Sequence, residues 1–180
     1  MLLADPRDML KHVRVMPGMR VADFGAGTGV YASVLLDRVG EEGQVYAIDA
    51  LPQALESIRR QTLKSGKRCM TVCSEFENEL PMRDNLLDLA VVANTLHAVD
   101  PTRRQFFVHE LQRVVTPGGQ VLLLEWADSF KNMGPPAPLI VPPVEAVRLF
   151  RTAGFSTSTM LPAGTHHYAF VATLPQVPTP

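Results

Sequence analysis

Apolar residues in this chain gather into short runs that are separated by stretches with helical spacing. The runs at 21–24, 44–48 and 86–93 are largely apolar, which is typical of strands that are buried on both faces. Between them, as at 30–39, apolar residues recur three or four positions apart, as they do on one face of a helix. This alternation predicts a parallel sheet with helices on both faces.

Turn residues delimit the remaining elements. The predicted strands are residues 21–24, 44–48, 68–72, 86–93, 120–124, 155–161 and 167–174. The predicted helices are 30–39, one from Pro52 to Gly66, one from Pro101 to the 117–119 turn with Phe106, Phe107, Leu111, Val114 and Val115 facing inward, and 144–153. Residues 6–15 carry a weak amphipathic stripe, and 129–143 is a proline-rich loop.

The end of the chain departs from the parallel pattern. Only residues 162–166 join the last two predicted strands, which is too short for a parallel crossover, so these strands form an antiparallel hairpin. The prediction is an α/β fold with a seven-stranded, mostly parallel sheet. A length of 180 residues suits one domain, which we place at 1–174, followed by a flexible tail at 175–180.

A glycine-rich turn follows the first strand. The segment 21–29 reads VADFGAGTG, so strand, glycine loop and helix follow one another as in a nucleotide-binding unit. Glycines at 25, 27 and 29 let the backbone approach a ligand closely. The dinucleotide pattern G-x-G-x-x-G would place its third glycine at Val30, whereas here the glycine comes one residue earlier. Taken alone, the segment is also compatible with a purely structural turn.

The form D-x-G-x-G-x-G resembles motif I of the class I S-adenosylmethionine-dependent methyltransferases. Over about residues 5–173 the chain is most similar to the small ubiquinone-biosynthesis-like (type 11) group of that family. The matching positions are Pro17-Gly18, 21–29, 46–49, Leu80-Pro81, Asp88, His97, 117–119 and 153–155. The resemblance implies a Rossmann-like sheet, S-adenosylmethionine as cofactor, S-adenosylhomocysteine as product, and methyl transfer to an acceptor.

Asp49, at the tip of the second strand, is the main candidate for holding the cofactor's ribose. A carboxylate there accepts two hydrogen bonds from a ribose diol, and the alternative is a cap for the helix near Pro52. By resemblance, Asp23 holds the glycine loop and the methionine ammonium, with a structural role as the alternative. The predicted cofactor-binding residues are Asp23, Gly25, Ala26, Gly27, Gly29, Asp49, Ala50, Leu51, Ser74, Glu75, Ala93 and Asn94, of which Ala50 and Leu51 pack on the adenine and Glu75 contacts its amino group.

The catalytic residues are left open, with Asn94, His97 and Glu125 as candidates. His97 either packs against the following segment or acts as a general base or substrate ligand. Glu125 could orient a substrate cation or accept a proton, and Trp126 could stack on the substrate, but both could instead anchor a loop. A sulfonium methyl is already activated, so in-line positioning is the protein's main task and no acid–base signature is required.

No metal site is predicted. His166 and His167 are adjacent and point to opposite faces of a regular strand, and Cys69 and Cys73 are read as buried free thiols. A net charge of −1 gives no electrostatic argument for a nucleic-acid partner. The sequence shows neither a signal-peptide pattern nor an apolar run of the ~18 residues that span a bilayer, which predicts a cytoplasmic protein without a membrane partner.

The leading hypothesis is methylation of a small molecule. Nucleic-acid or protein methylation is an alternative, although 93–96 reads ANTL and not an Asn-Pro-Pro-Tyr-type motif. Arsenite methylation fits poorly with two cysteines on one strand, and the antiparallel ending argues against a nicotinamide dehydrogenase. A cofactor-binding regulatory protein without catalysis is the hypothesis from another class. The acceptor and the oligomeric state stay open.

Overall fold

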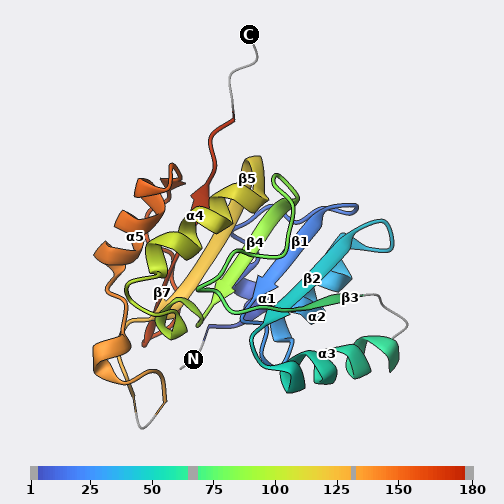
Figure 1. The fold of residues 1–180 in the computed structure, drawn as a ribbon, viewed down its shortest axis with the longest axis horizontal. Helices are drawn as coiled ribbons and strands as arrows, with labels where there is room; N and C mark the ends of the chain where they lie inside the picture. The colour runs from blue at the N-terminus through green and yellow to red at the C-terminus, as the bar shows by residue number, and fades with distance from the viewer. Residues whose placement is uncertain (1–3, 65–68, 131–132, 177–180) are drawn as a thin grey trace.

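The computed structural model describes residues 4–64, 69–130 and 133–176. Within them, one sheet has seven strands in the order β3-β2-β1-β4-β5-β7-β6 (Figure 1). The strands are β1 Arg20–Phe24, β2 Gln44–Asp49, β3 Cys69–Cys73, β4 Leu87–Ala93, β5 Val115–Trp126, β6 Ser156–Thr157 and β7 His167–Thr173. The first five are parallel, and β7 runs antiparallel to β5 and β6. The predicted α/β fold and its antiparallel ending are confirmed.

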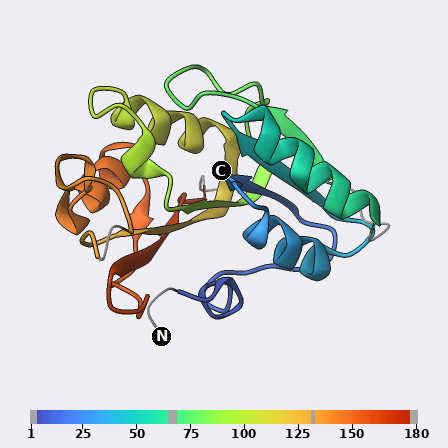
Figure 2. The same ribbon diagram turned by 90° about the horizontal axis from the view of Figure 1, so that it is seen from below.

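Helices cover both faces of the sheet (Figures 1 and 2). They are α1 Pro6–Met9, α2 Val30–Val39, α3 Pro52–Lys64, α4 Arg104–Val114 and α5 Pro143–Thr152, with 3-10 turns η1 Leu96–Ala98 and η2 Ala137–Leu139. The core on one face joins α1, α2 and α3, and the core on the other joins α4 and α5. None of the helices in the described part of the chain is long and apolar enough to cross a membrane.

Strand β4, at the centre of the sheet, is apolar along most of its length because both of its faces are buried. Ala90 and Val92 belong to the core beneath α4, and Leu89 and Val91 belong to the core beneath α2. All four side chains are fully buried. Because successive strand residues face opposite sides and both sides are covered, positions 89–93 are all apolar, and the one polar residue of the strand, Asp88, lies near its start.

The predicted boundaries of α4 and β5 were wrong. The helix begins at Arg104, after a turn in which the Asp100 carboxylate accepts the Thr102 N–H (2.8 Å), and it ends at Val114. Phe106 is only half-buried, and the guanidinium of Arg103 lies over its ring at 4.2 Å.

Strand β5 begins before the glycine turn that was expected to precede it. Val115 already pairs with Leu87, and a register shift absorbs the additional residues before Gln120 pairs with Leu89. Pro117, Gly118 and Gly119 therefore lie inside β5.

The strand expected at 155–161 is much shorter than predicted. Only Ser156 and Thr157 form β6, and a single bridge joins Leu161 to Ala169. Between them, the hydroxyl of Ser158 accepts the Val171 N–H (3.1 Å), so a side chain takes the place of a backbone carbonyl in the ladder.

The two cysteines are less buried than expected, because β3 is the edge strand of the sheet. Cys69 is partly buried, and Cys73, the last residue of the strand, is exposed. Burial raises the pKa of the Cys69 thiol to about 11, and the nearby Asp23 adds to the shift. The predicted stop at Gly66, strand residue Arg68 and tail residues 177–180 lie outside the described residues.

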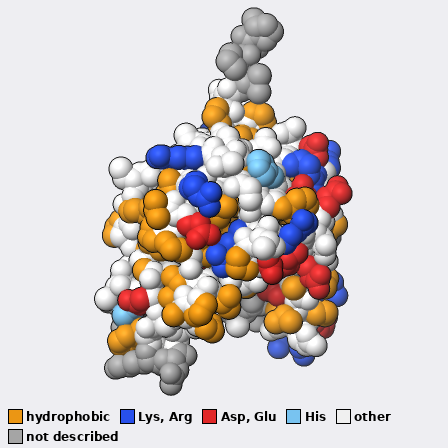
Figure 3. Space-filling view, turned by 60° about the vertical axis from the view of Figure 1, so that its left-hand side comes forward, with side chains coloured by type: hydrophobic (Ala, Val, Ile, Leu, Met, Phe, Trp, Pro, Cys, Tyr) orange, Lys and Arg blue, Asp and Glu red, His pale blue; other side chains and the backbone are white. Residues whose placement is uncertain are grey.

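The surface on the side of α5 carries mixed charges. Figure 3 looks onto this side, and acidic and basic side chains are interspersed there with apolar ones. Val144 in α5 and Leu139 in η2 are among the exposed apolar residues. No extended basic surface is visible on this face.

Candidate functional site

A cleft of about 590 Å³ opens at the carboxyl ends of β1, β2 and β4. Its lining residues are Gly25, Asp49, Ala50, Leu51, Glu75, Phe76, Glu77, Asn78, Asn94, Thr95 and Ala98. Six of these belong to the predicted cofactor set, namely Gly25, Asp49, Ala50, Leu51, Glu75 and Asn94. This edge of an open α/β sheet is where ligands bind in such folds.

Two backbone N–H groups hold the carboxylate of Asp49 in place. Its Oδ2 accepts the Gly27 N–H at 2.8 Å, and its Oδ1 accepts the Leu51 N–H at 2.9 Å. The residue is buried to 9% exposure but borders the cleft. Each carboxylate oxygen retains further capacity to accept a hydrogen bond, so Asp49 ties the glycine loop to the start of α3 and can still bind a ligand hydroxyl.

The glycine loop is shaped by contacts on two sides. The N–H groups of Gly25 and Ala26 both donate to the Ile48 carbonyl, at 2.8 and 3.0 Å, which draws the loop over the tip of β2. Gly25 has a φ of 72°, and a β-carbon there would collide with Thr95. At Gly27 (φ 50°) the nearest atom to such a carbon would be 3.9 Å away. Gly27 therefore borders open space at the Asp49 carboxylate.

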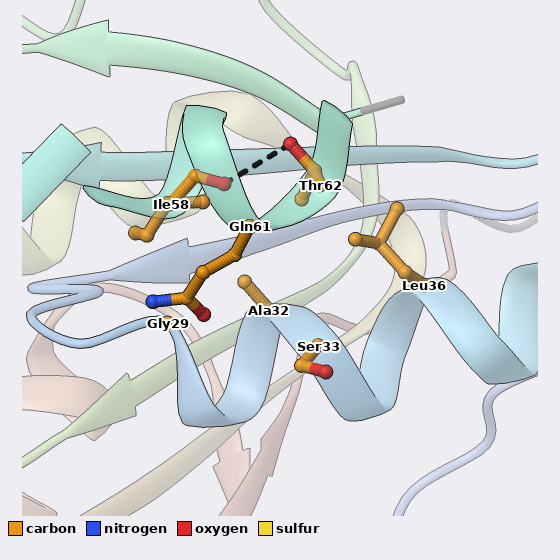
Figure 4. A pocket seen from close by; sticks show the side chains of 7 residues that line it. All are labelled: Gly29, Ala32, Ser33, Leu36, Ile58, Gln61 and Thr62. Atoms are coloured by element: carbon orange, nitrogen blue, oxygen red, sulfur yellow. Dashed lines mark hydrogen bonds between the residues drawn. The ribbon is translucent and has the colours of Figure 1, made fainter. Parts of the chain in front are cut away.

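A second, smaller cavity of about 100 Å³ lies between α2 and α3 (Figure 4). Gly29, Ala32, Ser33, Leu36, Ile58, Gln61 and Thr62 line it. The Thr62 hydroxyl donates to the Ile58 carbonyl at 3.1 Å, within its own helix. Because no charged side chain lines this cavity, it offers no counter-charge for a charged ligand. A β-carbon on Gly29 would lie 2.7 Å from Ile58, so this glycine is needed for packing.

Asp23 has a structural contact that fixes the start of α2. Its Oδ2 accepts the Ala32 N–H at 2.9 Å, and its exposure is only 2%. Burial raises the pKa of Asp23 to about 7, the hydrogen bond from Ala32 opposes the shift, and the nearby Asp49 adds to it. The expected contact with a methionine ammonium stays a prediction.

The residues after β3 and β4 form the two ends of the cleft. Glu75 is exposed and accepts a hydrogen bond from the Asn78 amide at 3.2 Å, whereas Ser74 does not line the cleft. Asn94 has a φ of 54°, and its N–H donates to the Leu124 carbonyl at 2.8 Å, which extends the pairing of β4 with β5 by one hydrogen bond. The Ala93 carbonyl accepts the Thr95 hydroxyl at 3.0 Å.

His97 and Glu125 are paired at the tips of β4 and β5. The Nδ1 of His97 lies 2.8 Å from Oε1 of Glu125, and the His97 N–H donates to Oε2 at 3.1 Å. The Trp126 N–H also donates to Oε1, at 2.8 Å. Glu125 is fully buried, so this carboxylate anchors the η1 turn to β5.

The two histidines before and at the start of β7 have different surroundings. His166 Nδ1 lies 2.6 Å from Oδ1 of Asp128, and its ring stacks on Phe130. The ring of His167 packs against Trp126 with centroids 4.1 Å apart, and burial lowers the pKa of His167. Among the residues that the structure describes, neither buried ring nitrogen of His167 finds a hydrogen-bond partner. Across the described ranges, no three His, Cys, Asp or Glu residues are grouped so that they could hold a metal ion.

Tyr168, in β7, is a core residue. It is 6% exposed, and its hydroxyl donates to the Val141 carbonyl at 2.8 Å. It lies on the face of β7 that packs in the core with α4 and α5, because successive strand residues alternate between the faces.

Four cleft residues that the sequence did not single out are Phe76, Glu77, Asn78 and Ala98, and Thr95 was named there only within the 93–96 segment. Phe76 packs with Phe24 and Phe107, at centroid distances of 6.1 and 5.0 Å, so its place follows from core packing. Thr95 is set by its hydroxyl, which donates to the Phe24 carbonyl at 2.9 Å. The signal that could have located them is their position immediately after the strands β3 and β4.

Comparison with known proteins places the chain in a family. Residues 21–119 match the family model described as "Methyltransferase domain". The ubiquinone/menaquinone biosynthesis C-methyltransferase UbiE of Cupriavidus taiwanensis is 33% identical over 119 residues, which are 66% of this chain and 48% of that protein. The chain thus spans about half the length of the curated relatives it matches.

Solved structures share the whole fold. A SAM-dependent methyltransferase from Aquifex aeolicus is 30% identical and superposes with a TM-score of 0.84 over 96% of this chain and 90% of that one. The [4+2]-cyclase SpnF is 17% identical, with a TM-score of 0.80 over 96% and 80% of the two chains, a likeness of fold alone. By its sequence match and fold, the chain belongs to the methyltransferase domain family, among the S-adenosylmethionine-dependent methyltransferases.

Proposed function

We propose that the cleft binds S-adenosylmethionine and that the protein directs its methyl group to a small-molecule acceptor. The observation that carries this proposal is the Asp49 carboxylate, fixed by the N–H groups of Gly27 and Leu51 at the cleft. A carboxylate held in one orientation recognises the two neighbouring hydroxyls of a ribose.

The other cleft residues fit the remaining parts of the cofactor. Leu51 is 63% exposed beside Asp49, and with Ala50 it offers an apolar surface for the adenine. Glu75, with Ser74 beside it, supplies a carboxylate for the adenine amino group. The backbone at Gly27 can approach the ligand closely, because there is open space where its side chain would be. Gly25 and Ala26 precede it in the same loop, and Gly29 follows it.

The methionine end would lie toward the tip of β4, where Ala93 and Asn94 stand between the glycine loop and β5. Bound there, the cofactor supplies an activated methyl group. The protein orients the acceptor in line with the carbon–sulfur bond and excludes water. Asp23 contributes by holding the first turn of α2 beneath the loop.

A small molecule is the acceptor that the observations favour. The curated relatives are C-methyltransferases of ubiquinone and menaquinone biosynthesis, and the net charge of −1 gives no footprint for nucleic acid. The mixed charges on the side of α5 agree with this (Figure 3). A nucleic acid or protein acceptor, or cofactor binding without catalysis, would be revealed by the experiment below.

Calorimetric binding of S-adenosylmethionine and S-adenosylhomocysteine tests the proposal. Asp49→Ala is expected to weaken both by about 30- to 150-fold, because about 2–3 kcal/mol of charge-assisted hydrogen bonding is lost. Asp88→Ala is the matched control: this carboxylate accepts the Arg20 N–H at 2.8 Å, at the opposite end of the sheet. The Asp88→Ala variant should bind both ligands as tightly as the wild type does.

Absence of binding by folded wild-type protein would refute the cofactor site. If binding is present, formation of S-adenosylhomocysteine with a panel of hydroxyl, amine, thiol and carbon acceptors, RNA and protein identifies the acceptor class. Binding without turnover on any of these would favour the regulatory alternative.

A further inference from the structure

The pair His97 and Glu125 is arranged as more than a loop anchor. The Glu125 carboxylate accepts the backbone N–H groups of Trp126 and His97, at 2.8 and 3.1 Å, and also faces His97 Nδ1 at 2.8 Å. A carboxylate that accepts from every side leaves Nδ1 as the donor. In the neutral ring, the hydrogen-bond network therefore assigns the proton to Nδ1 and the lone pair to Nε2.

The Nε2 atom of His97 is reachable. Its ring is 18% exposed, whereas Glu125 is 0% exposed, so the accessible edge of the ring is the one turned away from the carboxylate. Within the described ranges, Nε2 has no hydrogen-bond partner. The buried side-chain atoms without a partner there are Tyr31 Oη and the two ring nitrogens of His167, so Nε2 of His97 is unpaired but not buried. A fixed imidazole thus presents a free, accessible lone pair.

His97 also stands beside the cleft. It lies in η1 between Thr95 and Ala98, which both line the cleft, and three residues after Asn94. Three residues span at most roughly 11 Å, so the imidazole stands within one small-molecule length of the tip of β4. This is the region to which we assigned the methionine end of the cofactor.

We propose that His97 Nε2 is the general base that takes a proton from the methyl acceptor, and that Glu125 is the positioning residue that fixes its tautomer. The acceptor is accordingly a molecule whose reacting atom carries a removable proton, a hydroxyl or an acidic carbon. This inference rests on the proposed function and specifies its acceptor class.

The acceptor's O–H or C–H bond breaks and its proton goes to Nε2, while the electron pair left behind forms the bond to the methyl carbon. The carbon–sulfur bond breaks and its electron pair stays on sulfur, giving neutral S-adenosylhomocysteine and an imidazolium. The Glu125 carboxylate stabilises that imidazolium, which then loses its proton to water at its exposed edge. Thiolates and neutral amines already present a lone pair, so they do not need this base.

The first test is the protonation of His97 in the complex with S-adenosylhomocysteine. Long-range proton–nitrogen NMR spectra of histidine-labelled protein, recorded at a pH where the ring is neutral, should show the His97 proton on Nδ1. Glu125→Gln should change this signature, because one amide oxygen cannot replace two carboxylate oxygens. A proton on Nε2 in the wild type, or no change in Glu125→Gln, overturns the proposal.

The second test compares rates with phenol, catechol and hydroquinone as hydroxyl probes and with thiophenol and aniline as probes that need no base. His97→Gln should lower kcat with a hydroxyl probe about 100- to 10,000-fold. Affinity for S-adenosylhomocysteine should stay within about twofold, because this base makes no ground-state contact with the cofactor. His109→Gln, an exposed histidine in α4, is the matched control and should behave as the wild type.

The outcomes separate the two proposals. Three results each overturn the proposal that His97 is the general base. They are equal rates in His97→Gln and wild type, methyl transfer only to thiophenol or aniline, and cofactor binding with no transfer to any probe. In the first two cases the methyltransferase proposal stands. If the wild-type protein does not bind the cofactor, the proposed function itself is refuted.

Discussion

The hydroxyl of Thr95 occupies the position that a β-carbon on Gly25 would take. The two residues are far apart in the chain, yet the Thr95 side chain also donates to the Phe24 carbonyl at 2.9 Å. The glycine loop and the segment after β4 are thereby packed directly on each other. Both walls of the cleft therefore depend on a glycine at position 25, because a side chain there would collide with Thr95.

Gly25→Ala should therefore lower the free energy of unfolding by about 2–4 kcal/mol, combining left-handed backbone strain with the collision with Thr95. Urea unfolding measures this loss. Gly18→Ala is the control, because Gly18 has a similar φ of 83° but nothing within 4 Å of an added β-carbon, so only the strain of about 1 kcal/mol applies. Equal losses in the two variants would contradict the packing argument.

Asp23 predicts a pH dependence of stability. Its pKa is about 7 in the folded protein, against 3.8 for the exposed group, so between these values the folded state keeps a proton that the unfolded state has released. The free energy of unfolding should fall as the pH rises through this window, by at most about 1.4 kcal/mol per pH unit. Asp23→Asn should flatten this part of the curve measured by urea unfolding.

The control for this curve is Asp100→Asn. The pKa of Asp100 is lowered below its ordinary value of 3.8, mainly by hydrogen bonds from Thr102, so its contribution to stability is lost only as the pH falls below about 4. Between pH 4 and 7, Asp100→Asn should run parallel to the wild type. If Asp23→Asn also runs parallel there, Asp23 is ionised in the folded protein throughout the window.

His167→Phe should stabilise the protein by about 1 kcal/mol, because two buried nitrogens without partners are removed and the stack on Trp126 is kept. Burial lowers the pKa of His167, so below the unfolded value of 6.5 the unfolded state gains a proton that the folded state resists. The gain should thus be larger at pH 5.5 than at pH 7.5.

Thermal unfolding at both pH values measures this, with the exposed His109→Phe as a control that leaves stability unchanged. A decrease in stability for His167→Phe would mean that the imidazole makes a contact that the phenyl ring cannot replace.

Arg104 joins α4 to the η2 turn and α5. It is 3% exposed and donates to the Leu139 carbonyl at 3.1 Å and to Glu145 at 3.3 Å. Arg104→Met should lower the free energy of unfolding by about 1–3 kcal/mol, because the Leu139 carbonyl and the Glu145 carboxylate lose the buried guanidinium that donates to them. Arg148→Met, at an exposed position of α5, is the control for urea unfolding. A loss no larger than that of the control would show that the guanidinium is dispensable.

The fold was predictable because its signals are local. Apolar runs and turn residues locate most strands, and the link between β6 and β7 is too short for a parallel crossover, which fixes their antiparallel direction. The boundaries that were wrong depend on packing: Phe106 lies beneath Arg103, and Val115 leaves the helix because it pairs with Leu87. Neither partner is visible in the local pattern.

The residues of the candidate site were likewise predictable from the sequence only in part. Gly25, Gly27 and Asp49 were predictable because a glycine loop followed by a strand that ends in a carboxylate is a sequence signal. The closeness of Gly25 to Thr95 and the pairing of His97 with Glu125 bring together segments that only the sheet order makes neighbours. Polar groups on two strand tips could be suspected from sequence, but the hydrogen bonds between them could not.

The position of β7 between β5 and β6 constrains how the protein is made. Strand β7 is synthesised after β6 yet lies inside it in the sheet, so until Thr173 has emerged from the ribosome, the nascent chain presents β5 as an unpaired edge. The five parallel strands can assemble earlier, but this edge closes only when β7 is available. A ribosome that stalls before β7 has emerged would expose a nearly complete sheet with one strand edge open to aggregation.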